Sequence, residues 1–139
     1  MEIRENVLDI EVFSELREDI GWRSFPKERT RSALANDLYD VVAFDGDKAI
    51  GMGRLVGDGI LYFYVQDVVV RKDYQGQGIG TQVLKQLLAY VNAILSEGED
   101  CSVGLIAAQG KEPFYERFGF SSLPDASSGA GMYIRMKKA

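Results

Sequence analysis

The feature that most constrains this sequence is a glycine-rich turn between its longest β-like run and its longest helical run. Ile60 to Val70 is rich in β-branched and aromatic residues, which is typical of a strand. From about Ile79 to Leu95, apolar residues recur at helical spacing and form one stripe. Between the two runs stands Gln75-Gly76-Gln77-Gly78-Ile79-Gly80. This order predicts a strand, a tight turn and an amphipathic helix that crosses back over a sheet.

The rest of the chain reads as short elements around this unit, with no linker, repeat or low-complexity tract. We therefore expect a single domain over residues 1–139. Periodicity and turn residues predict further strands over 3–6, 41–44, 49–56, 102–107 and 131–136, and helices over 9–20, 27–38 and 112–118. Asp9 is the predicted N-cap of the first helix, and Gly21 is predicted to end it.

Composition limits the classes of function. Apolar residues make up 46% of the 139 and charged residues 27%, a balance typical of a globular domain. The net charge is −5, from 16 Lys+Arg against 21 Asp+Glu. An acidic surface disfavours nucleic acid as the main partner, because phosphate binding needs clustered cations. It mildly favours cationic substrates such as amines, although acidity also serves solubility alone.

Some chemistries are excluded because the residues they require are missing. The sequence has no histidine and a single cysteine, Cys101, so it allows no Ser-His-Asp or Cys-His system, no internal disulfide and no His-based metal site. No metal is expected. The N-terminus is charged and lacks the apolar core of a signal peptide, and no stretch approaches the roughly 20 apolar residues that span a bilayer. We expect a cytoplasmic protein without a membrane partner.

The glycine-rich turn has the chemistry of a phosphate site. Glycines let the backbone turn tightly and let a ligand approach closely. The first N–H groups of the following helix lack internal partners, and the helix dipole favours negative charge there. A pyrophosphate fits that environment. The alternative is a bare strand-to-helix connection. A Walker A loop is set aside because Gly80 is followed by Thr81 with no Lys, and a Rossmann site because the turn does not follow a first strand.

Two motifs together resemble the GNAT N-acetyltransferases. Gln75 to Gly80 matches that family's Gln/Arg-x-x-Gly-x-Gly/Ala pattern, and the run from Val65 to Val70 with Tyr74 is similar to its fourth strand. Downstream, Pro113 to Phe120 resembles its second signature, Phe-Tyr-x-x-x-Gly-Phe. The resemblance implies an α/β (α+β) fold with a central mixed, twisted sheet of six to seven strands and about four flanking helices. It also implies acetyl-CoA as co-substrate, and homodimers are common in the family.

The resemblance assigns residues to the cofactor. The pantetheine arm would run along the fourth strand, and the pyrophosphate would be held by backbone N–H groups of the glycine-rich loop. Many relatives carry an Asn after the fifth strand, where this sequence has Gln109 as a longer replacement. The implied cofactor-binding residues are Val68, Val69, Val70, Gln75, Gly76, Gln77, Gly78, Ile79, Gly80, Thr81 and Gln109.

Tyr115 is the first candidate catalytic residue. It matches the tyrosine that many family members place near the sulfur of the cofactor. A thiol has a pKa of about 8.5 and a phenol about 10, so a phenol can donate a proton or hydrogen bond to a leaving thiolate. The alternative is a core tyrosine beside Phe114 and Phe118, which occupy positions i and i+4 of the same helix.

Asp67 is the second candidate. It interrupts an apolar strand, where an acid is costly unless it is paired or functional. It resembles an acidic position that several acetyltransferases use to place or deprotonate the amine. The alternative is a structural carboxylate that fixes a loop or a neighbouring arginine.

The acceptor side is less constrained. In the family, the first two helices and the late loops shape the acceptor pocket, which implies Trp22, Phe25, Arg54 and Tyr64, with Arg23, Met132 and Tyr133 as further candidates. Trp22 and Phe25 can equally join the two helices, and Arg54 can equally pair with Asp58 or Asp67. An aromatic wall with acidic residues suits an amine that has an apolar or flat part.

These observations predict transfer of an acetyl group from acetyl-CoA to a primary amine of a small molecule or peptide by direct attack on the thioester. Cys101 lies at the start of the predicted fifth strand, too far from Tyr115 to act as the nucleophile of a ping-pong mechanism. The alternative is a non-catalytic domain that binds or senses acyl-CoA.

Overall fold

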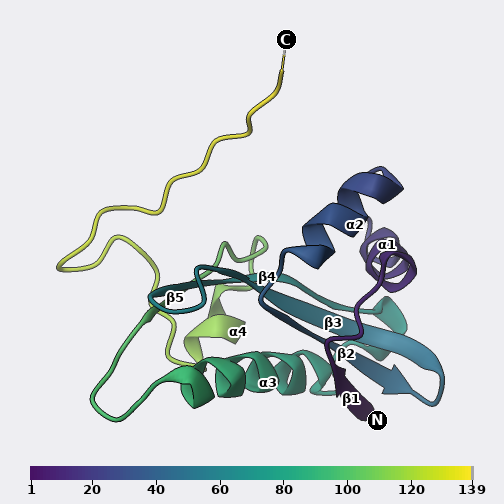
Figure 1. Cartoon of the computed structure of the whole chain (residues 1–139), viewed down its shortest axis with the longest axis horizontal. Coiled ribbons are helices and arrows are strands. Elements are labelled where there is room, and N and C mark those ends of the chain that lie inside the picture. Colours follow the sequence, from purple (N-terminus) through teal and green to yellow (C-terminus); the bar gives the residue numbers. More distant parts are fainter. Residues whose placement is uncertain (139) are drawn as a thin grey trace. The chain divides into compact units, whose positions relative to one another are not determined.

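The computed structural model describes residues 1–138, which divide into two compact units, residues 1–105 and residues 106 onward. The first unit holds one sheet and three α-helices, which Figure 1 shows in their arrangement. Along the chain these are β1 (Glu2–Glu5), α1 (Ile10–Asp19), α2 (Lys27–Ala35), β2 (Tyr39–Asp45), β3 (Lys48–Gly57), β4 (Tyr62–Val70), α3 (Ile79–Ile94) and β5 (Ser102–Gly104). A 3-10 turn, η1 (Lys72–Tyr74), connects β4 to the glycine-rich loop.

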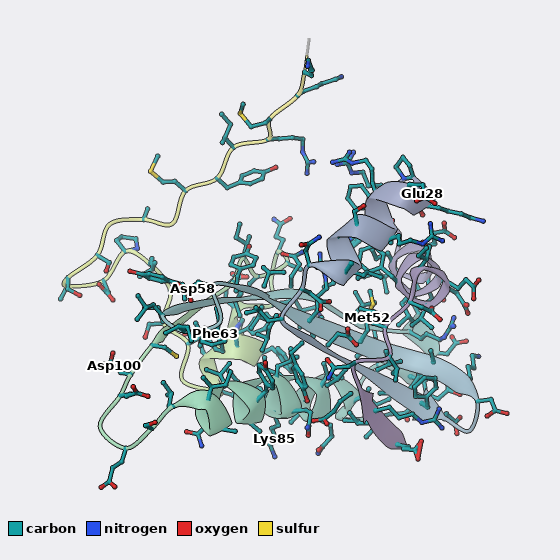
Figure 2. The ribbon with its side chains drawn as sticks, in the orientation of Figure 1. Glu28, Met52, Asp58, Phe63, Lys85 and Asp100 are labelled. Carbon is teal, nitrogen blue, oxygen red and sulfur yellow. The ribbon has the colours of Figure 1, made fainter. Side chains whose placement is uncertain are left out.

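The sheet is mixed, and its strands follow chain order from β1 to β5. The first four strands are antiparallel to their neighbours, and β5 is parallel to β4 after the α3 crossover. Helices α1 and α2 lie on one face and α3 on the other (Figure 1). Figure 2 shows Phe63 between the sheet and α3, whereas Lys85 projects from the outer side of that helix. The crossover predicted around the glycine-rich turn is thus present.

Local signals predicted the first helix well. The Asp9 side chain accepts a hydrogen bond from the Val12 N–H at 2.9 Å and caps α1 as expected. Gly21 follows the helix with a φ of 82°, a conformation that glycine adopts without steric cost. The inner side of α1 packs its apolar residues on the sheet. That core comprises Leu8, Phe13, Leu16, Val42, Ala49, Met52 and Val69.

The other face of the sheet is covered by α3, whose predicted apolar stripe is largely confirmed. Ile79, Val83, Leu84, Leu87 and Val91 are buried. Close approach of this helix depends on Gly53 of β3. A Cβ atom there would lie 2.7 Å from Val83 Cγ1 and 3.0 Å from Leu87 Cδ1, both shorter than ordinary contacts. Gly53 therefore lets α3 sit directly on the sheet.

In its described residues, the second unit contains one helix, α4 (Glu112–Glu116), within the predicted range 112–118. The strand predicted over 131–136 is wrong, because the residues there form neither helix nor strand in the described part of the chain. The strand predicted over 102–107 ends at Gly104. The described sheet accordingly has five strands rather than six to seven. Strands form only with a neighbour, and periodicity along a sequence does not supply one.

Candidate active site

The loop between β4 and α3 ends in a glycine that forms the N-cap of α3. Gly76 and Gly78 have φ angles of 80° and 81°. A Cβ atom on either glycine would meet nothing within 4 Å, so this side of the loop is open. Within the described residues, no side chain caps α3 and its first turn contains no acidic residue. The N–H groups at the start of this 16-residue helix are therefore available to an anion.

Gln75 closes the loop on the strand side. Its backbone N–H donates to the Lys72 carbonyl at 3.3 Å, and its Nε2 donates to the Val70 carbonyl at 3.0 Å. The first bond of α3 runs from the Gln82 N–H to the Gly78 carbonyl at 3.1 Å. Of the amides that the sequence assigned to pyrophosphate, that of Gln75 is thus already engaged. The amides from Gly76 to Thr81 remain as the candidate cradle for an anion.

Strand β4 leads into this cradle along an edge that the sheet leaves partly open. Among the described residues, β5 pairs only with Tyr62, Phe63 and Tyr64 of β4, whereas β4 runs on to Val70. The Arg71 N–H donates to the Ile50 carbonyl at 2.9 Å. Because backbone groups alternate in direction along an antiparallel strand, those of Val70 point away from β3. The side chain of Val69 is buried in the α1-side core. An extended ligand can therefore run along β4 towards the loop.

Asp67 occupies a bulge in β4. Met52 pairs with Val69 and Arg54 with Gln66, so one residue of β3 stands opposite both Asp67 and Val68. Asp67 adopts a φ of 55°, in the left-handed region that Asp tolerates better than most residues. The bulge turns its side chain towards the face covered by α1. Local patterns in the sequence give no sign of this kink.

Both carboxylate oxygens of Asp67 are paired. Arg17 Nη1 donates to Oδ1 at 2.6 Å, and Arg54 Nε donates to Oδ2 at 2.9 Å. The side chains are 2% exposed for Asp67, 10% for Arg17 and 12% for Arg54. Of the two partners expected for Arg54, Asp67 is the observed one. Asp58 instead accepts from the N–H groups of residues 60 to 62, which lower its pKa.

The guanidinium of Arg17 joins three elements of the first unit. Besides Asp67 of β4, its Nε and Nη2 both donate at 3.1 Å to the Arg23 carbonyl, in the loop between α1 and α2. Its Cζ lies 5.1 to 5.3 Å from the ring centroids of Phe13, Trp22 and Phe25. These are cation–π distances. The two predicted acceptor aromatics thus face a buried cation.

Trp22 and Phe25 also pack against the α1-side core as partly buried residues. This packing agrees with the joining role that the sequence left open for them, and an acceptor role stays a prediction. Tyr64 lies on β4, three residues before Asp67, and is half-buried. The structure therefore groups Trp22, Phe25, Arg54 and Asp67 around Arg17, on the sheet face opposite α3.

In the second unit, Tyr115 belongs to an aromatic cluster. Its ring meets Phe114 edge-on at 5.0 Å and Phe120 at 5.9 Å, and Phe114 contacts Phe118 at 5.5 Å, all between centroids. Burial raises the pKa of the Tyr115 phenol. A phenol with a raised pKa stays protonated at neutral pH and can donate a hydrogen bond. Its catalytic role stays a prediction, as does cofactor binding by Gln109, which lies in an exposed turn.

Arg17 is a candidate site residue that local sequence patterns did not identify. It stands on the apolar stripe of α1 at the spacing of Phe13, Leu16 and Ile20. A charged residue on a stripe that faces the core needs a buried partner, and this was the available signal. The partner itself, 50 positions away at Asp67, is not visible from local patterns. In residues 1–138 no cluster of three or more His, Cys, Asp or Glu could hold a metal, and no helix is long and apolar enough to cross a membrane.

Comparisons with known proteins show which family shares this fold and this loop. The family model described as "Acetyltransferase (GNAT) domain" matches residues 37–122. A probable acetyltransferase of unknown function from meticillin-resistant Staphylococcus aureus superposes with a TM-score of 0.83 at 32% identity, over 97% of this chain and 98% of the other.

Curated sequences agree with the structural match. An uncharacterized N-acetyltransferase ycf52-like of Prochlorococcus marinus is 31% identical over 130 residues, which cover 91% of this chain and 70% of that protein. Rice serotonin N-acetyltransferase 2, chloroplastic, is 30% identical over 131 residues, which cover 91% of this chain and 63% of the rice protein. The chain belongs to the GNAT acetyltransferase family.

Proposed function

We propose that residues 1–139 act as one N-acetyltransferase domain that transfers an acetyl group from acetyl-CoA to a primary amine of a small molecule or peptide. The observation that supports this most is the open amide cradle from Gly76 to Thr81 at the end of the partly unpaired β4 edge. A glycine turn that served only to connect two elements would not require an uncapped helix start facing open space.

In this proposal the chain's own residues bind and orient the cofactor. The amides of residues 76 to 81 hold the pyrophosphate, and the backbone of Val68 and Val70 pairs with the pantetheine arm. The fit is supported by the open space beside Gly76 and Gly78 and by the absence of an acid in the first turn of α3, within the described residues. When bound, acetyl-CoA supplies an acyl group activated as a thioester, which an amine attacks directly.

Tyr115 is the proposed proton donor to the departing thiolate. Its pKa, raised by burial, keeps the phenol protonated until a proton is needed. For Asp67, the two guanidiniums on its carboxylate favour the organising role over that of a free base. A base role predicts that Asp67→Asn lowers the rate most at low pH, where deprotonation of the amine is hardest. An organising role predicts a loss that is uniform across pH.

The acceptor is proposed to be an amine with a flat or apolar part. Trp22 and Phe25 line the sheet face that carries Asp67 and Arg54. The name of the rice relative, a serotonin N-acetyltransferase, makes arylalkylamines the first compounds to try. The test panel is serotonin, spermidine, glucosamine 6-phosphate and a peptide with a free N-terminus.

Two measurements test the proposal in sequence. First, acetyl-CoA should raise the melting temperature, because a ligand at about 100 times its Kd adds ~2.7 kcal/mol of stability. No stabilisation near millimolar acetyl-CoA would remove the cofactor assignment. Second, thiol release from acetyl-CoA is followed with each amine of the panel. Stabilisation without amine-dependent thiol release from any of them would favour the non-catalytic acyl-CoA-binding domain.

A further inference from the structure

The side chain of Arg17 links the α1–α2 loop to β4. Its Nη1 reaches Asp67 at 2.6 Å, while Nε and Nη2 reach the Arg23 carbonyl at 3.1 Å. One planar group thus bonds both a loop carbonyl and a strand carboxylate. Only a guanidinium has donors that diverge in this way, because an ammonium is a compact point charge.

The loop side chains pack around the same group. Trp22 and Phe25 present their rings to the Arg17 guanidinium at 5.2 and 5.1 Å, and Phe13 of α1 completes the enclosure at 5.3 Å. A buried cation that is both ion-paired and enclosed by rings has few alternative positions. The orientation of the two loop aromatics therefore depends on where Arg17 is held, and Asp67 holds it.

The ion pair between Arg17 and Asp67 lies beside the edge of β4 along which the cofactor is proposed to run. Asp67 immediately precedes Val68 and shares its bulge, so the loop is fixed to the part of β4 next to the proposed pantetheine edge. Arg54 pairs with the other oxygen of Asp67 at 2.9 Å and keeps the carboxylate in place. Asp67 therefore retains one partner when Arg17 is replaced, which makes substitution of Arg17 informative.

We propose that Arg17 is a positioning residue that fixes the α1–α2 loop to the Asp67 bulge and thereby sets the affinity for the acceptor amine. This inference rests on the proposed acetyl transfer beside β4. Arg17 itself touches neither the amine nor the cofactor. Its loss should change recognition of the amine and leave the acetyl-CoA site, which is built from the β4 edge and the glycine-rich loop, intact.

The test compares wild type with Arg17→Lys, which keeps the charge for Asp67 but loses the fork to the Arg23 carbonyl. The matched control is Arg31→Lys on α2, where the arginine makes an exposed pair with Glu28. The first readout needs no substrate. Trp22 is the single tryptophan of the chain, so acrylamide quenching of tryptophan fluorescence reports the loop alone. The second readout is the pair of KM values, for acetyl-CoA and for each amine of the panel that wild type acetylates.

We expect Arg17→Lys to fold, to make Trp22 at least about twice as quenchable, and to raise the amine KM by about tenfold, because small misplacement of a binding group costs one to two orders of magnitude. The acetyl-CoA KM should stay within about twofold of wild type, because the substitution removes no contact with the cofactor. Arg31→Lys should match wild type in every readout.

Unchanged quenching of Trp22 would overturn the proposal, as would an acetyl-CoA KM that rises as much as the amine KM. If Arg17→Lys does not fold, Phe25→Leu removes one ring from the enclosure and should shift both readouts in the same direction, and an unaltered Phe25→Leu would equally overturn it. If wild type acetylates no amine of the panel, the proposed function fails on that result, while quenching of Trp22 still decides whether Arg17 fixes the loop.

Discussion

Replacing Gly78 by alanine separates the structural role of the glycine-rich loop from its proposed role as a phosphate cradle. Gly78 has a φ of 81°, where an L-residue is strained by roughly 1–2 kcal/mol. In a domain of this size that strain lowers the melting temperature by about 3–8 °C. The added methyl meets no protein atom within 4 Å, so it stands in the open space where the proposed ligand approaches.

The matched control is Gly98→Ala in the loop between α3 and β5. Gly98 has a φ of 85°, and a Cβ atom there also meets nothing within 4 Å, so the strain is the same but the cradle is untouched. Both variants should lose similar stability in thermal unfolding. In calorimetric titration, Gly78→Ala should bind coenzyme A at least about tenfold more weakly than Gly98→Ala, a difference of ~1.4 kcal/mol. Equal affinities in the two variants would show that the glycine-rich loop does not hold the cofactor.

Three further substitutions test the packing of α3, an electrostatic effect and the proposed proton donor. Gly53→Ala should lower the free energy of unfolding in urea by about 1–3 kcal/mol, because its methyl overlaps Val83 of α3; an unchanged midpoint would contradict the packing. Burial and nearby Asp40 raise the pKa of Asp37 from 3.8 to about 6, so the folded state binds its proton more tightly and loses stability as pH rises through that window. At pH 8, the free energy of unfolding of Asp37→Asn, measured by thermal unfolding, should therefore exceed that of wild type by ~1 kcal/mol after allowance for solvent screening. At pH 4, Asp37→Asn and wild type should be about equally stable. Tyr115→Phe should lower kcat by about 10²-fold on a confirmed amine at unchanged acetyl-CoA KM, and an unchanged kcat would remove the acid role.

Elements set by local chemistry were predictable from the sequence. Asp9 caps α1 because its side chain reaches an amide three residues on, and the stripe from Ile79 to Val91 faces the sheet because α-helical periodicity places it there. The loop at Gly76 and Gly78 was located by its glycines. Each of these features depends on residues a few positions apart.

Features that depend on distant partners were not predictable. The acid at Asp67 was recognised as unusual, but its partners Arg17 and Arg54 come from α1 and β3. The bulge that orients Asp67, with its backbone in the left-handed region, arises from the register between β3 and β4. The strand expected over 131–136 fails for the same reason, because alternation indicates a possible strand without supplying the neighbour that forms it.

The most direct test of the central claim is to follow backbone amide resonances during titration with coenzyme A. The largest shifts should fall on residues 76 to 81 and on Val70, the amides at the start of α3 and at the end of β4. Uniform small shifts, or large shifts confined to other segments at saturating coenzyme A, would contradict a cofactor site built on the glycine-rich loop.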